Sequence, residues 1–413
     1  MLNFVGECSA INLIAVRGFG EAEFWLSGGK VILIFLLFGF TFVTMVGGNP
    51  AGDAYGFRHW TNPGAFRENL STGPLGRFEG FLACLWNASF AVVGPEYISM
   101  VAAEAKRPRI YIKTAFKTIY YRFALFFFGS ALCVGIVLAY NDRFLSVLHG
   151  TASEEVMKEE NVDGNASSTA AASPYVIAME NMGIQVLPHI VNALMMTSIY
   201  SAGNTYTFCA TRTLYGLALE GRAPRFLRKT WSNGVPIYCF CVVMVFPMLS
   251  FLQVGESSSE VIGWFVSLIT AGGIIDFIVM NVTFICFYNA CKAQGLDRKT
   301  LPYYGRFQPY GAYFALFIQI LICGAYGYTV FKPWDVESFF RNYTMQILAP
   351  ILFFGWKFVK KTKWLKPMEV DLKWEAPLID AYEARFTEPA PGFWTEMIRM
   401  VGIKRKSKPA SDV

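Results

Sequence analysis

The chain has 413 residues, of which 54% are hydrophobic and 16% aromatic, and its formal net charge is +6. Only 16% of the residues are charged, against about a quarter in soluble domains, so the composition excludes a soluble protein and predicts a polytopic membrane protein. The basic residues gather in short loops between apolar runs, which argues against a nucleic-acid partner. Nine cysteines without C-x-x-C spacing and three scattered histidines predict neither a disulfide framework nor a metal site.

The apolar runs predict an all-α protein with eight membrane spans. Residues 11–16 are too few to cross a bilayer and are interpreted as the end of an earlier helix. Residues 17–23 are interpreted as a polar turn punctuated by glycines, and the first complete span, with Lys30, as residues 25–46. Seven further spans are expected at about 78–105, 119–140, 187–211, 235–252, 261–288, 310–331 and 344–358.

The loops between these spans alternate between basic and basic-poor sequences. Lysine and arginine cluster at 106–117, 212–229, 292–306 and 357–366. The positive-inside rule predicts that these segments, and therefore both chain termini, are cytoplasmic. The loops 47–77 and 141–186 are predicted to be external, and each contains a glycosylation sequon, at Asn69 and Asn165.

Three parts follow from this pattern. Residues 1–23 are interpreted as the remnant of a preceding helix and a cytoplasmic turn. Residues 24–361 are predicted to form the membrane domain, and residues 362–413 a cytoplasmic C-terminal tail that lies on the membrane surface or docks on other loops.

The second complete span is interrupted at its centre by Gly94, Pro95 and Glu96. Proline lacks an N–H and clashes with the carbonyl four residues before it, so the helix is expected to unwind here. Unwound backbone at membrane depth is found where it is buried in protein or lines a watery cavity, and broken helices form the substrate sites of secondary transporters. Glu96 is itself a candidate functional residue. The alternative is a simple proline kink whose carboxylate faces a partner helix.

Two other spans carry polar residues that suggest a functional role. Lys30 lies about 10 Å along the helix axis from Glu23. It either extends to the membrane surface or is buried and exchanges protons. Ser201, Asn204 and Thr205 belong to a dense run of small and hydroxyl residues, which serves close helix packing, forms a cavity wall, or does both.

Asp276 is a second carboxylate within a predicted span, next to a flexible glycine pair, and is a candidate for a polar network or a proton relay. Arg122 and Arg212 lie near predicted cytoplasmic ends and are interpreted as interfacial anchors. The sequence shows no phosphate-binding loop, nucleophile elbow or metal-ligand spacing, so an enzyme is not expected.

Seven stretches in order along the chain form a further pattern. They are 16–25 (VRGFGEAEFW), 57–66 (FRHWTNPGAF), 102–109 (AAEAKRPR), 173–178 (SPYVIA), 201–204 (SAGN), 212–218 (RTLYGLA) and 294–303 (QGLDRKTLPY). Together they resemble the fungal amino acid permeases of the amino acid–polyamine–organocation superfamily, with most similarity to the dicarboxylic and general amino acid permease branches.

The resemblance implies an inverted-repeat (LeuT-like) transporter fold with amino acid bound between the first and sixth helices. By that scheme the eight predicted spans correspond to helices five to twelve, and the first four helices are not in this sequence. The implied substrate-binding residues are Phe90, Ala91, Val92, Val93, Gly94 and Glu96.

The resemblance also implies individual roles. Phe90 would cover the substrate and Glu96 would form a polar gate below it, with Lys30 and Glu96 as the proton-coupling residues. Relatives often have Thr before this glutamate, where the chain has Pro95, which weakens the expected hydrogen bonding to substrate. Ser201, Asn204 and Thr205 would line the same region, together with Asp276, for which the resemblance implies no role.

The resemblance therefore implies proton-coupled uptake (symport) of amino acids across a fungal plasma membrane. The expected partners are an amino acid, protons and the lipid bilayer, with no cofactor. Two alternatives are a membrane protein that senses amino acids without transporting them, and an inactive truncated permease.

Overall fold

The computed structural model describes Gly6 and Leu145 and residues 12–13, 16–105, 107–142, 173–249, 258–305, 307–331 and 334–386. Within these ranges the secondary structure is helical, apart from one isolated antiparallel bridge between Phe331 and Trp334. The sequon at Asn165 and the predicted tail beyond residue 386 lie outside the described residues.

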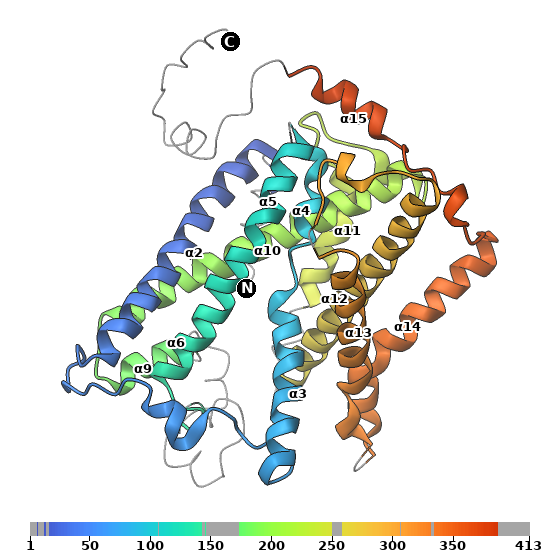
Figure 1. Ribbon diagram of the computed structural model, residues 1–413. Coiled ribbons are helices and arrows are strands. Elements are labelled where there is room, and N and C mark those ends of the chain that lie inside the picture. The colour runs from blue at the N-terminus through green and yellow to red at the C-terminus, as the bar shows by residue number, and fades with distance from the viewer. Residues whose placement is uncertain are drawn as a thin grey trace, which may run out of the picture.

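Each of the eight predicted spans coincides with helix (Figure 1). The long helices are α2 (Val16–Met45), α3 (Gly73–Val92), α5 (Pro108–Phe123), α6 (Gly129–Val137), α10 (Leu187–Leu219), α11 (Ile237–Met248), α12 (Ser258–Ala293), α13 (Tyr310–Ala325) and α14 (Val336–Lys360). The short ones include α4 (Tyr97–Met100), α9 (Pro174–Asn181), α15 (Ala376–Glu383) and the single turns Trp60–Gly64, Ala102–Glu104, Ala124–Phe128, Arg225–Arg228, Arg298–Thr300, Tyr328–Val330 and Pro367–Glu369.

Five helical segments are long and apolar enough to cross a membrane by length and composition. They are Phe19–Met45, Gly73–Met100, Pro108–Val137, Gly263–Ala293 and Tyr310–Val330. Of the other predicted spans, α11 has only 12 residues in its helix, and α10 is long but carries the run of small and hydroxyl residues. The prediction of an all-α polytopic membrane protein is confirmed.

Two segments that the sequence predicts to be non-helical are helices. Residues 17–23 form the first turns of α2, because a glycine inside a helix costs only about 1 kcal/mol relative to alanine and good helix formers follow. The basic linker after residue 107 is the start of α5, with Pro108 in the first turn, where its missing N–H is not needed.

The predicted external loop 141–186 contains a buried helix. Val176 and Met179 of α9 are completely buried, and they pack with residues of α2, α6 and α10 in the largest hydrophobic core of the described chain. A second core joins α3, α12 and α13, where the Trp86 ring stacks on Tyr326 with 3.4 Å between centroids. The break between α3 and α4 lies between these two helix groups (Figure 1).

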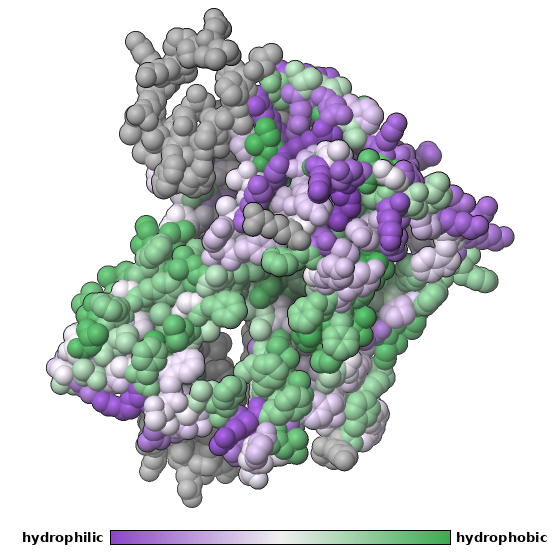
Figure 2. Space-filling view, in the orientation of Figure 1, coloured by the Kyte–Doolittle hydropathy of each residue, from purple (hydrophilic) through white to green (hydrophobic). Residues whose placement is uncertain are grey.

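Contacts between distant segments bring the four predicted basic clusters to one end of the bundle. Glu104 forms an ion pair with Arg212 at 3.1 Å, and Arg109 pairs with Asp380 of α15. Gln294 donates hydrogen bonds to two backbone carbonyls in the segment between α14 and α15. Figure 2 shows hydrophilic side chains concentrated at this upper end, with hydrophobic side chains over the helices below it.

Candidate functional site

The span that the sequence predicts to be broken is divided into two helices. α3 ends at Val92 and α4 begins at Tyr97. Gly94 has φ +135°, a conformation that glycine adopts at little cost. The Glu96 side chain folds back, and its Oε2 accepts a hydrogen bond from the Gly94 N–H at 3.1 Å. The carboxylate thus accepts from a backbone amide that the interrupted helix leaves without a helical partner. This bond matters because Glu96 is only 7% exposed, so water has little access to either group.

The unwound segment packs closely on α12. A Cβ atom at Gly273 would lie 2.6 Å from Cγ2 of Val93, so only glycine allows the two backbones to come this near without rearrangement. A Cβ atom at the neighbouring Gly272 would lie 3.7 Å from Cε of Met345, an ordinary contact distance. One glycine of the pair therefore fixes the position of the break against α12.

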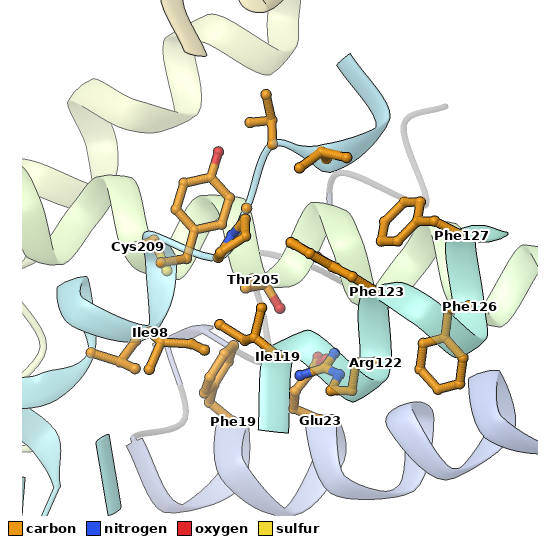
Figure 3. A pocket seen from close by; sticks show the side chains of 16 residues that line it. Phe19, Glu23, Ile98, Ile119, Arg122, Phe123, Phe126, Phe127, Thr205 and Cys209 are labelled. Carbon is orange, nitrogen blue, oxygen red and sulfur yellow. The ribbon is translucent and has the colours of Figure 1, made fainter. Parts of the chain in front are cut away.

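A cavity of about 520 Å³ opens on one side of the unwound segment (Figure 3). This volume is within the range of small-molecule sites. Its walls are mainly aromatic and aliphatic, and they come from α2, α5, α10 and both halves of the broken helix. Two charged side chains line it, Glu23 from α2 and Arg122 from α5, together with the hydroxyl residue Thr205 from α10.

Glu23 connects this cavity to Lys30. Lys30 Nζ donates to Ser201 Oγ at 2.6 Å and lies 3.5 Å from Glu23 Oε1. Ser201 and Ser27 also donate to Glu23 Oε1. The other oxygen of Glu23, Oε2, is buried and has no hydrogen-bond partner among the described residues. A carboxylate that lines the cavity therefore has one oxygen engaged by the lysine network and one oxygen free.

The run of small and hydroxyl residues on α10 serves both packing and the cavity wall. Ser201 and Asn204 are fully buried. Asn204 Oδ1 accepts a hydrogen bond from Asn12 at 2.7 Å, whereas its Nδ2 is buried without a partner in the described structure. Thr205, the next residue, faces the cavity.

The structure brings together some of the predicted site residues and separates others. Val92, Val93 and Gly94 line the cavity, and Lys30 reaches it through Glu23. Phe90, 42% exposed, and the exposed Ala91 lie outside its walls. Two carboxylates also lie elsewhere. Glu96 lines a different cavity on the other side of the unwound segment, and Asp276 is exposed on α12 outside the walls of both.

The two arginines that the sequence suggests as interfacial anchors, Arg122 and Arg212, both contact other parts of the protein. The side chain of Arg122 points into the cavity (Figure 3). Arg212 is largely buried, pairs with Glu104 and lies over the Phe208 ring at 5.2 Å.

Sequence reasoning also missed Glu23 as a site residue, although its spacing of seven from Lys30 places both on one face of a helix. Among the described residues, no His, Cys, Asp and Glu group could hold a metal ion.

A discontinuous span beside a mainly apolar cavity with two charged side chains, set among helices apolar enough to cross a membrane, defines an integral membrane protein. Broken helices of this kind form the substrate sites of secondary transporters. The model of the family described as Amino acid permease matches residues 2–367. The chain is 39% identical over 383 residues to the general amino acid permease AGP2 of Saccharomyces cerevisiae, covering 90% of this chain and 62% of that protein. It is 37% identical over 367 residues to the dicarboxylic amino acid permease of the same yeast, covering 88% and 58%.

It is also 35% identical over 393 residues to the proline-specific permease of Emericella nidulans, covering 94% of this chain and 69% of the relative. The chain therefore belongs to the amino acid permease family, as its sequence motifs predict. It spans less than two thirds of the length of the two yeast relatives.

Proposed function

We propose that this chain transports amino acids across a membrane and holds the substrate in the cavity beside the unwound segment. The observation that carries this proposal is the presence of one carboxylate and one guanidinium, Glu23 and Arg122, on different helices around the same cavity. An amino acid zwitterion carries the complementary pair of charges, so its ammonium would bind the Glu23 carboxylate and its carboxylate would bind Arg122. The aromatic and aliphatic walls would surround its side chain.

Proton coupling is the second part of the proposal, with Lys30 as the principal coupling residue. The proton on Lys30 balances the negative charge of Glu23 where α2 meets α10, so its loss would change the electrostatic contact between these two helices. Proton binding would therefore shift the balance of outward-facing and inward-facing states, because the two states would bind the Lys30 proton with different affinity. Glu96 is a second coupling candidate because its carboxylate holds the Gly94 amide at the break. Protonation of Glu96 would weaken this hydrogen bond and change the position of α4, the half of the broken span that follows it.

The orientation follows from the basic end of the bundle. We propose that this end is cytoplasmic, with both termini on that side, and that the membrane is the plasma membrane of a fungus. The grouping of the basic clusters by the Glu104–Arg212 and Arg109–Asp380 pairs supports a common side.

The test is uptake by the purified chain in liposomes, measured with radiolabelled proline, aspartate and a neutral amino acid, with and without an inward proton gradient. Saturable uptake that the gradient drives uphill supports the proposal. Binding to the same preparation, measured in detergent, separates the alternatives. A sensor would bind without uptake, and an inactive permease would do neither, so either result overturns the transport proposal.

A further inference from the structure

A groove runs along the side of the unwound segment opposite the candidate substrate cavity. Its larger part has a volume of about 1130 Å³ and lies between α5, α12, α13 and the loop that precedes α13. A second cavity of about 380 Å³ continues it toward α3, and the two share Pro95 and Phe277 in their walls. Val92, Pro95 and Phe123 line both the smaller cavity and the substrate cavity, so the unwound segment and α5 form the wall between the two sites.

The chemistry of the groove changes along its length. At the basic end of the bundle its walls carry Lys117, Tyr120, Tyr303 and Tyr304. The smaller cavity, farther along, is lined almost entirely by apolar side chains such as Leu85 and Ile322. Tyrosine and lysine favour the membrane interface, and aliphatic walls suit an acyl chain. The groove is therefore polar at one end and apolar at the other, in the same order as the headgroup and acyl chains of a phospholipid in one leaflet.

The length of the groove fits the same ligand. Phe123 lines the smaller cavity, and Lys113 lines a further cavity that adjoins the larger part of the groove at the basic end. These two residues of α5 are ten residues apart, about 15 Å along a helix. Half the hydrocarbon thickness of a bilayer is also about 15 Å. A lipid with its phosphate at the lysines would place its acyl chain beside Phe123 and Pro95.

Two lysines at the basic end, Lys117 in the groove wall and Lys113 in an adjoining cavity, lack a counter-charge among the described residues. Lys113 and Lys117 are four residues apart, one turn of α5, and neither has an ion-pair partner among the described residues. Lys113 lines a small adjoining cavity that shares Tyr303 with the groove. The nearby cation Arg109 is already paired with Asp380. Glu96, a carboxylate of the groove wall, is engaged by the Gly94 N–H. The lysines therefore form an anion-binding end on an apolar groove.

We propose that the groove binds an anionic glycerophospholipid from the leaflet at the basic end of the bundle. Its phosphate would bind Lys113 and Lys117, and an acyl chain would occupy the smaller cavity and contact Pro95 from the side opposite the substrate. A soluble anion would leave the apolar end unused, and a zwitterionic lipid would compensate the two lysines less well. Occupancy would support the helix break, so this lipid would also affect the conformation of the substrate site.

The test is native mass spectrometry of the full chain, purified in detergent and titrated with phosphatidylserine or phosphatidylcholine of equal chain length. We expect the chain to retain phosphatidylserine roughly tenfold more tightly, because two basic residues face the headgroup. The variant Lys113→Gln/Lys117→Gln should lose this preference. The control Lys357→Gln/Lys360→Gln removes the same charge at the end of α14, outside the groove, and should keep it.

A second variant tests the apolar end independently. Ala88→Trp places an indole in the smaller cavity and should weaken retention of both lipids several-fold while the preference for phosphatidylserine persists. Equal retention of the two lipids by the unmodified chain would overturn the proposal, as would an unchanged preference in the Lys113→Gln/Lys117→Gln variant. Neither readout requires transport, so failure of the proposed function would leave this test intact.

Discussion

Lys30 of α2 donates a hydrogen bond of 2.6 Å to Ser201 of α10, although 171 residues separate them in sequence. The bond holds the ammonium against α10, where it is 34% exposed and 3.5 Å from Glu23. Of the two locations that the sequence allows for this lysine, extension to the membrane surface or burial, the structure shows a partly buried ion pair. The interaction therefore joins the two longest helices of one core at the edge of the candidate substrate cavity.

The first prediction concerns Lys30→Ala in liposomes with an inward proton gradient. The variant should lose uphill accumulation of amino acid, because Glu23 loses the cation whose proton we propose to be coupled. Downhill exchange between internal and external substrate should persist, because the cavity walls are unchanged. Uphill uptake equal to that of the unmodified chain would contradict the coupling role. Lys229→Ala, a change at an exposed lysine of the predicted cytoplasmic loop, is the matched control and should leave both activities unchanged.

The second prediction concerns the two charged residues of the cavity. Glu23→Gln should weaken amino acid binding roughly tenfold to a hundredfold, because a hydrogen bond to a charged group contributes about 1.5–3 kcal/mol. Arg122→Gln should weaken it by a similar factor. Isothermal titration of the purified variants measures both effects. An amine analogue that lacks the substrate carboxylate distinguishes the two roles. The unmodified chain should bind this analogue more weakly than the amino acid, whereas Arg122→Gln should bind the two ligands almost equally.

Glu21→Gln is the control for this pair. Glu21 is exposed on α2, outside the cavity walls, so the substitution removes the same charge two residues from Glu23. Its affinity for amino acid should equal that of the unmodified chain. If Glu23→Gln and Arg122→Gln also retained full affinity, the zwitterion would bind elsewhere.

The break in the second span was predictable because its cause is local. Gly94 and Pro95 oppose helix by their own backbone chemistry, and Glu96 supplies an acceptor two residues from the free amide. The cavity wall was less predictable, because it depends on the register of α2 against α10. The interpretation of residues 17–23 as a turn hides the role of Glu23, since only a continuous helix places it on the same face as Lys30.

The helix α9 shows a second limit of sequence reasoning. Its five consecutive buried residues, 175–179, are too few for a span and lack a clear helical period, so the pattern of polar residues around them predicted a loop. Their burial depends on α2, α6 and α10 meeting at that point. The exposed positions of Phe90 and Asp276 also depend on tertiary packing, which spacing along one helix does not specify.

The third prediction is a pH dependence of stability from His59, in the loop between α2 and α3. Burial, with a smaller effect of the Arg58 charge, lowers the pKa of His59 below 6.5. The unfolded chain then binds a proton more readily than the folded chain, so the stability contributed by neutral His59 is present above pH 6.5 and is lost as the pH falls toward the folded-state pKa. Thermal unfolding in detergent should show a Tm that decreases across this window.

His59→Gln should reduce the decrease of Tm at low pH, because glutamine at position 59 does not bind a proton in this pH range. His189→Gln serves as the control, since that histidine is exposed on α10, and it should leave the slope of Tm against pH unchanged. A slope that is identical in His59→Gln and in the unmodified chain would show that another group causes the dependence.

The fourth prediction uses the adjacent glycines of α12. Gly273→Ala should destabilise the protein by about 1–3 kcal/mol, the usual cost of overpacking, because its Cβ would approach Cγ2 of Val93 to 2.6 Å and valine has little freedom to rotate away. Gly272→Ala should be neutral or stabilising, because its Cβ meets only Met345 at 3.7 Å and alanine favours helix. The combination Gly273→Ala/Val93→Ala removes the clashing methyl and should recover most of the loss in Tm. Equal Tm values for the two single variants would mean that the unwound segment does not rest on Gly273.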